Sequence, residues 1–230
     1  MKERPIIFSG HMVRAILDGR KTQTRRVARS LSVYQDRSRW SYVIRTGRHS
    51  TISLDTVEEA ARFCPYGVPG DRLWVREKWR PSWTDGMCTR IEYAADGALS
   101  VDVTEHLCHA KAVRGGDPAR GIYWRPSIHM PRWACRLVLE VVSVRVQRVQ
   151  DISEADAIAE GVRDIRGERI DSECWIKASV LSLTTTRGHT DAQRHRAAFW
   201  DLWESINGKG SWTANPWVWV IEFRRSVATN

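Results

Sequence analysis

The sequence has little that would carry it into or across a membrane. Its 230 residues contain no apolar run that approaches the roughly 18 residues a transmembrane helix requires. The N-terminus, Met1-Lys2-Glu3-Arg4-Pro5, leads only into the short apolar pair Ile6-Ile7, which is not a secretory signal. We therefore expect a cytoplasmic protein with no membrane partner.

Cysteine pairing and metal-binding patterns are also absent. The five cysteines are an odd number, widely scattered, and none forms a CxxC pair. They are Cys64, Cys88, Cys108, Cys135 and Cys174. Reduced thiols in a cytoplasm explain this usage most simply. His106, Cys108 and His109 lie close in sequence, but their spacing matches no standard zinc pattern, so we expect no metal.

A nucleoside-triphosphate loop is missing as well. Lys209 lies in Gly208-Lys209-Gly210-Ser211, but the first glycine of GxxxxGK[ST] is absent and no strand precedes the segment. We expect no nucleotide triphosphatase and no cofactor. Lys209 stays a candidate for contacts with nucleic acid.

Positive charge is present in excess, and all of the excess is N-terminal. The formal net charge is +9. Residues 1–50 hold 12 Lys and Arg against 3 acidic residues, whereas the remaining 180 hold 24 of each kind. Such concentration favours a polyanionic partner, because cations that neutralise phosphates release condensed counterions. A solvated basic face that only aids solubility is the alternative.

Apolar spacing predicts a mixed fold in one domain. We expect short strands and helices that alternate along the chain. The predicted strands are residues 4–8, 71–77, 137–149 and 217–223, and the predicted helices are residues 9–18, 56–63, 104–112, 153–161 and 191–207. Asp96-Gly97 predicts a hairpin. Residues 28–70 and 78–131 are interpreted as insertions, the first of them mostly loop. The class is α+β, a small mixed or antiparallel barrel with helices packed outside it.

The segment Gly19-Arg20-Lys21-Thr22-Gln23-Thr24-Arg25-Arg26 concentrates four cations and two hydroxyls. Neighbouring cations disfavour one another's charge, so the pKa of Lys21 could be lowered enough for it to act as a base. Thr24 would then be the hydroxyl that it activates. Alternatively, these residues only grip phosphates or lie in water.

Glu160 stands out by its position at the end of a predicted helix. An acid there faces the negative end of the helix dipole, so its pKa should tend upward. If it is also buried, it is a proton donor near neutral pH. The alternative is an exposed glutamate without a role.

The segment Gly19–Arg26, with the preceding Ile16-Leu17-Asp18, resembles the GxKxxTxR-type signature of the ASCH domain, a member of the PUA-like barrel superfamily. The blocks PGDRLWVRE, ISEADAIAEGV and NPWVWVIEF also resemble phage and prophage proteins that carry this domain, which would place the chain in a host cytoplasm. The resemblance covers the first 27 residues and roughly 71–77, 137–162 and 215–225.

This resemblance implies a β-barrel with a cleft for a base or nucleoside. Some compact ASCH proteins are amidohydrolases that remove acetate from N4-acetylcytidine. By motif their catalytic residues fall on Lys21 as base, Thr24 as nucleophile and Glu160 as acid. The present chain is longer and more basic at Arg25-Arg26, which favours a larger substrate.

Other functions remain open. Other ASCH proteins resemble ribonucleases, so cleavage of a strand in the same basic cleft is one alternative. A non-catalytic module that binds RNA rather than DNA through Arg20, Arg25, Arg26 and Lys209 is another. A phage regulator of a host protein is a third, and no sequence feature favours it.

Overall fold

The computed structural model describes residues 1–36, 39–46, 48, 50–84, 87–100, 123–162 and 194–226. Within these ranges the chain combines strands with short helices, which confirms the α+β class. It divides into two compact units. The first comprises Met1–Asp18, Gly70–Glu140 and Arg224–Asn230, and the second comprises Gly19–Pro69 and Val141–Phe223.

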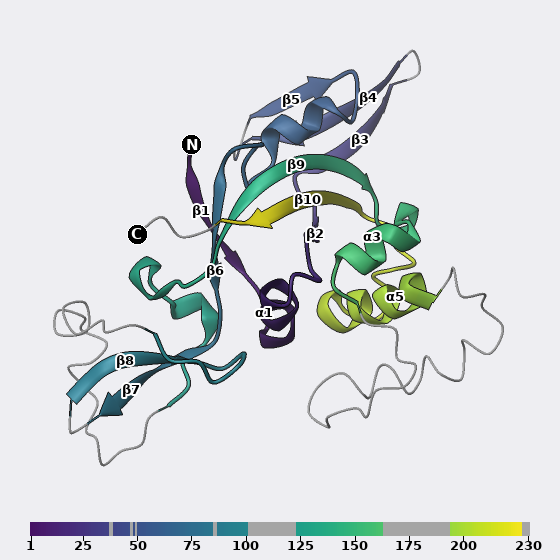
Figure 1. Cartoon of the computed structure of the whole chain (residues 1–230). Coiled ribbons are helices and arrows are strands. Elements are labelled where there is room, and N and C mark those ends of the chain that lie inside the picture. Colours follow the sequence, from purple (N-terminus) through teal and green to yellow (C-terminus); the bar gives the residue numbers. More distant parts are fainter. Residues whose placement is uncertain are drawn as a thin grey trace. The chain divides into compact units, whose positions relative to one another are not determined.

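The largest sheet has the strand order β1-β6-β9-β10-β2 (Figure 1). Its strands are β1 (Glu3–Ile7), β2 (Gln23–Val27), β6 (Arg72–Arg76), β9 (Val138–Arg148) and β10 (Trp217–Arg225). β9 and β10 each continue from one unit into the other, so each unit holds a part of this sheet. Among the described residues, β1 and β2 are edges of the sheet, and the strands do not close into the expected barrel.

The first unit is built on the parallel pair of β1 and β6, and β6 continues the sheet antiparallel to the start of β9. Helix α1 (Gly10–Leu17) follows β1, and Gly19, with a positive φ of 74°, lets the chain leave the helix. A hairpin of β7 (Trp79–Thr84) and β8 (Met87–Tyr93) precedes two short 3₁₀ turns, η3 (Ser127–His129) and η4 (Arg132–Ala134). Three hairpin residues, Trp79, Ile91 and Tyr93, pack with Met130 and Ala134 in one buried cluster.

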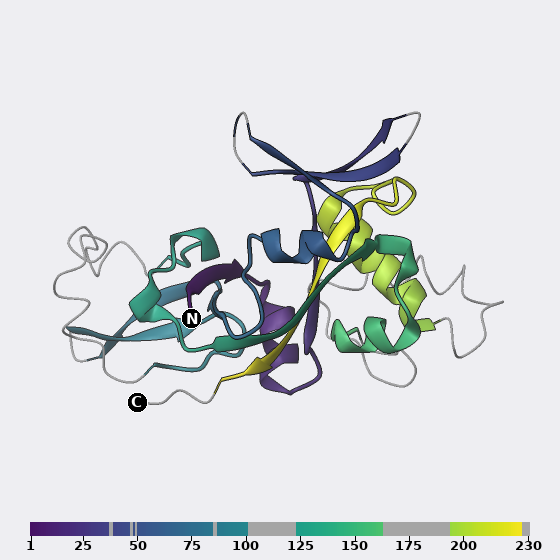
Figure 2. The same cartoon turned by 90° about the horizontal axis from the view of Figure 1, so that it is seen from above.

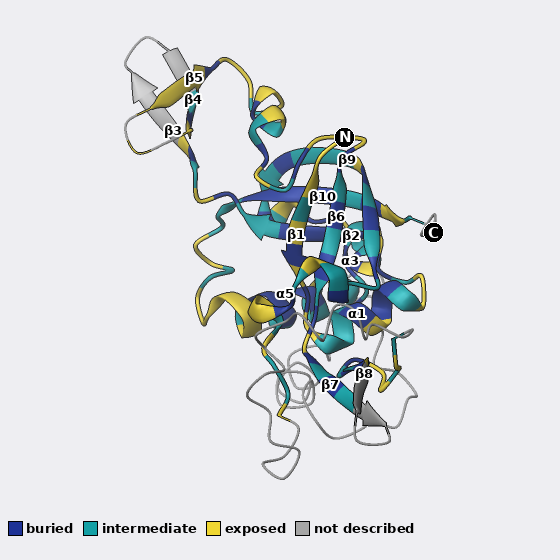
Figure 3. Ribbon diagram, turned by 90° about the vertical axis from the view of Figure 1, so that its left-hand side faces the viewer, coloured by how far each residue is buried: buried dark blue, intermediate teal, exposed yellow. Residues whose placement is uncertain are grey.

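The second unit pairs β2 antiparallel with β10, which is buried along most of its length (Figure 3). Helices α3 (Glu154–Ala159) and α5 (Arg194–Asn207) lie side by side in this unit (Figures 1 and 2). A separate antiparallel sheet contains β3 (Leu31–Asp36), β4 (Arg39–Arg45) and β5 (Thr51–Leu54). Two 3₁₀ turns complete the unit, η1 (Glu59–Phe63) and η5 (Val149–Asp151).

The interpretation of residues 28–70 as mostly loop is wrong. They form the three-stranded sheet β3-β4-β5, and the helix expected near residues 56–63 is the 3₁₀ turn η1. The segment is polar, but neighbouring strands satisfy one another's backbone groups whatever side chains they carry. The overall polar composition of the segment concealed a short apolar alternation that its strands do contain, at Leu31/Val33, Trp40/Tyr42/Ile44 and Ile52/Leu54.

The turn at Asp96-Gly97 is confirmed, although the strand before it, expected at residues 90–95, runs from Met87 to Tyr93. Gly97 has a positive φ of 72°, and the amide of Tyr93 donates to the carbonyl oxygen of Ala98 at 3.0 Å. β8 pairs with the preceding strand β7, which was not predicted, and across the turn its Glu92 also forms an antiparallel bridge with Leu99. The helix expected at residues 104–112, and with it His106, Cys108 and His109, lies outside the described residues.

The remaining strand and helix predictions agree with the structure to within a few residues at their ends. The prediction of one domain with two insertions stays a prediction. Among the described residues, no helix combines the length and apolar character that crossing a membrane would need.

Loss of the N-terminal cap of α3 is expected to destabilise the second unit. The Ser153 hydroxyl accepts a hydrogen bond from the amide of Asp156 at 3.1 Å, and the Asp156 carboxylate accepts one from the amide of Ser153. Ser153→Ala should therefore lower the free energy of unfolding by about 1 kcal/mol, measured by urea denaturation. Ser153→Asp keeps an acceptor and should retain most of that stability. An unchanged midpoint for Ser153→Ala would contradict the prediction.

Candidate active site

The structure brings Lys21 and Glu160 together across 139 residues of sequence. The Lys21 ammonium donates to the Glu160 carboxylate oxygen Oε2 at 2.8 Å, and the side chains are 0% and 4% exposed. It also donates to the main-chain oxygens of Glu160 and Gln23, both at 2.8 Å. These three acceptors match the three protons of an ammonium group.

The backbone holds this pair in place. Lys21 and Glu160 form an isolated antiparallel bridge, and the amide of Thr22 donates to the carbonyl oxygen of Ala159 at 2.9 Å. Glu160 is the C-cap of α3, and the following Gly161 has a positive φ of 82°, which turns the chain out of the helix. The end of α3 is thus fixed against the start of β2.

Arg25 is the second cation on Glu160. Its Nη1 lies 3.1 Å from Glu160 Oε1, its Nη2 lies 3.1 Å from Asp156 Oδ2, and its side chain is fully buried. The guanidinium also lies over the ring of Phe199 on α5, 5.7 Å from the ring centroid. Arg25 was expected to contact nucleic acid. Its burial between two carboxylates instead favours a role in holding Glu160.

The pKa of Lys21 is lowered from its ordinary value, although the main cause is not the one expected. Burial lowers it most, because the charged form loses its hydration. The contact with Glu160 opposes this shift, and the charges of Arg26 and Arg25 add smaller lowering effects. Burial of Asp156 raises its pKa, but Arg25 and Arg145 outweigh that effect, so its pKa is lowered.

Thr24 lies close in sequence but differs in orientation. It is buried in β2 and pairs with Ile221 of β10, whereas Arg26 pairs with Trp219. Because side chains alternate along a strand, Thr24 shares a face with Arg26 and lies on the opposite face from Arg25. The ion pairs join Lys21, Arg25 and Glu160, and no contact in the described structure joins the Thr24 hydroxyl to them.

The other predicted cations have different environments. Arg20 is partly buried and donates to the main-chain oxygen of Gly161 at 3.2 Å. Arg26 is partly buried and lines a cavity. Lys209 is exposed in the loop after α5. Binding of nucleic acid by these residues stays a prediction.

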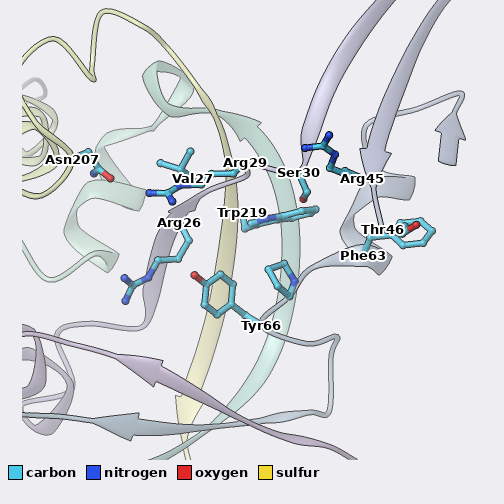
Figure 4. A pocket seen from close by; sticks show the side chains of 11 residues that line it. Arg26, Val27, Arg29, Ser30, Arg45, Thr46, Phe63, Tyr66, Asn207 and Trp219 are labelled. Carbon is cyan, nitrogen blue, oxygen red and sulfur yellow. The ribbon is translucent and has the colours of Figure 1, made fainter. Parts of the chain in front are cut away.

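A cavity of about 770 Å³ adjoins β2 and β10 in the second unit (Figure 4). Three arginines and three aromatic residues contribute to its wall. The lining residues are Arg26, Val27, Arg29, Ser30, Arg45, Thr46, Phe63, Pro65, Tyr66, Asn207 and Trp219. Lys21, Thr24 and Glu160 are not among them. Arg26 links the two places, because it lines the cavity and its charge contributes to the lowered pKa of Lys21.

Arg29, Arg45 and Tyr66 were missed by the argument from sequence. They lie in residues 28–70, which were interpreted as an insertion and in which no site residue was predicted. The signal that could have found the two arginines was the excess of basic residues, which extends over the first 50 positions.

Comparison of the chain with protein-family models, curated proteins and solved structures found no match.

Because Lys21 and Arg25 both contact Glu160, we predict that substitution of Glu160 destabilises the fold more than substitution of Lys21. Glu160→Gln leaves the buried Lys21 and Arg25 without the carboxylate that both contact. We expect a loss of about 3 to 5 kcal/mol in the free energy of unfolding. Lys21→Met leaves Glu160 paired with Arg25 and should cost less. Urea denaturation of both variants checks this order, and a larger loss for Lys21→Met would contradict it.

The lowered pKa of Lys21 also predicts a dependence of stability on pH. Between the folded pKa and the ordinary value of 10.5, the unfolded chain binds more protons at this residue than the folded one. The free energy of unfolding of the wild type, relative to Lys21→Met, should therefore rise with pH in that window. The slope is at most about 1.4 kcal/mol per pH unit. Urea denaturation at several alkaline pH values measures it, and a constant difference would contradict the expectation.

Proposed function

We propose that this chain is an ASCH-type protein of the PUA-like superfamily that removes the acetyl group from N4-acetylcytidine-type substrates. The observation that carries the proposal is the buried ion pair of Lys21 and Glu160. The motif resemblance assigns these two residues to one site. Convergence across 139 residues supports that assignment.

The environment of the pair suits acid–base chemistry. Burying charges is costly, and buried titratable groups with shifted pKa values cluster at functional sites. A single proton transfer over the 2.8 Å contact turns the ammonium and carboxylate into an amine and a carboxylic acid. This neutral form contains a base and an acid together. Burial favours it, whereas Arg25 on Glu160 opposes it.

The reaction follows from these roles. The reaction requires a rearrangement that brings the Thr24 hydroxyl to Lys21, since the Lys21 amine donates in the described structure to Gln23 and Glu160 instead. The Lys21 amine then takes the proton of the Thr24 hydroxyl, and the Thr24 oxygen attacks the acetyl carbonyl carbon. The bond from that carbon to N4 breaks as Glu160 donates its proton to the nitrogen, which releases cytidine. Water then cleaves the acetyl–threonine ester to acetate: the Glu160 carboxylate takes a proton from the water, and the Thr24 oxygen recovers its proton from Lys21.

The cavity supports a substrate that contains a nucleoside. Its volume of about 770 Å³ is within the range usual for small-molecule sites. Thr24 shares a strand face with Arg26 and Trp219, which line the cavity, so a base held there would approach the proposed nucleophile from that face.

A non-catalytic module that binds RNA is the second candidate, and the three arginines of the cavity favour it. In that case Lys21 and Glu160 would serve only to hold α3 against β2. Contacts with phosphates would account for the binding, which would weaken steeply with salt.

Release of acetate from N4-acetylcytidine tests the amidohydrolase. Thr24→Ala and Glu160→Gln should lower kcat by about 10² to 10⁴ through loss of the nucleophile or the acid. Thr22→Ala is the matched control, because it removes an exposed hydroxyl two residues away and should leave turnover unchanged.

Thr24→Ser keeps a hydroxyl and should recover part of the activity lost in Thr24→Ala. Circular dichroism verifies that each variant is folded. Folded wild-type protein that releases no acetate would overturn the amidohydrolase, as would a Thr24→Ala variant with full turnover.

A further inference from the structure

The cavity has a charge pattern that the removal of an acetyl group does not require. Arg26, Arg29 and Arg45 contribute three cations to the wall, and among its described lining residues there is no Asp or Glu. Cytidine carries no charge at neutral pH, so a free nucleoside gains little from three guanidinium groups. The pattern instead suits an anion.

The arginines differ in their surroundings. The charge of Glu160 acts on Arg26, and burial lowers the pKa of Arg26. Arg29 and Arg45 are exposed, so they can meet a ligand without losing buried partners. The amide of Arg45 donates to the carbonyl oxygen of Ser30 at 2.9 Å, which fixes the end of β4 beside the residue that follows Arg29.

The rest of the wall suits the base and sugar of a nucleotide. Phe63, Pro65 and Tyr66 supply apolar surface from η1 and the turn after it. In Figure 4 the hydroxyl of Tyr66 points toward Arg26, and Ser30 and Arg45 lie beside Trp219. Planar guanidinium groups bind phosphate oxygens in pairs, and a half-buried aromatic ring packs against a base.

We propose that this cavity binds the phosphate of a pyrimidine nucleotide through Arg29 and Arg45, with the base against Tyr66. The inference rests on the proposed function where it concerns the substrate: the acetylated cytidine arrives as a nucleotide, free or within a strand, and not as a nucleoside. Arg29, Arg45 and Tyr66, all from the segment interpreted as an insertion, then determine specificity.

Binding without turnover tests the cavity independently of the amidohydrolase. Titration calorimetry should show that cytidine 5′-monophosphate binds at least about tenfold more tightly than cytidine. Inorganic phosphate should compete with the nucleotide. The double variant Arg29→Ala/Arg45→Ala should lose this preference. The matched control Arg48→Ala/Arg62→Ala, which removes two exposed arginines from the same segment outside the cavity, should retain it.

Equal affinities of wild type for the nucleotide and the nucleoside would overturn the inference. A preference that survives in Arg29→Ala/Arg45→Ala would also overturn it.

Turnover then separates the two proposals. If the inference holds, kcat/KM of wild type is at least about tenfold higher for N4-acetylcytidine 5′-monophosphate than for N4-acetylcytidine, mainly through KM. A short RNA with one acetylated cytidine distinguishes a strand from a free nucleotide as the source of the phosphate. Preferred binding of the monophosphate without acetate release would refute the amidohydrolase alone. Acetate release at equal kcat/KM from both small substrates would refute the phosphate site alone.

Discussion

The burial of one ammonium group is the constraint on which the candidate site depends. A lysine amine withdrawn from water must find acceptors inside the protein, because an unpaired buried charge is prohibitively unfavourable. Lys21 finds them at two main-chain oxygens and one carboxylate. These contacts require that α3 ends at Glu160, which is its C-cap residue. The position at which α3 ends therefore determines which acceptors are available to Lys21.

Further ion pairs extend from the contact between Lys21 and Glu160. Arg25 shares Glu160 with Lys21 and reaches Asp156. Asp156 also contacts Arg145 of β9 at 2.7 Å, and Arg145 contacts Glu222 of β10. The network connects β2, α3, β9 and β10 through alternating positive and negative groups. Such alternation keeps each buried charge next to an opposite one, which low local polarity demands.

The sequence predicted the parts of the site that depend on local rules. The capping pair Ser153 and Asp156 follows from residue types at fixed spacing. The pairing of Lys21 with Glu160, in contrast, was expected only from the resemblance and not from a local rule. The depth of burial of Arg25 could not be predicted, because it depends on packing against Phe199 from a distant helix. The cavity was missed for a related reason. Its arginines come from β2, from the turn after β2 and from the end of β4, so its wall forms only when these segments are brought together.

The edge position of β2 has a consequence for how the protein is made. Its partner in the sheet is β10, so the pairing joins residues as distant as Gln23 and Glu222. Contacts this far apart in sequence form slowly, since a long loop must close before they stabilise anything. During synthesis, the basic motif leaves the ribosome long before the strand that covers it. The nascent chain thus carries Lys21 without its acceptor Glu160 until α3 has been made, and β2 without its partner strand until β10 has been made.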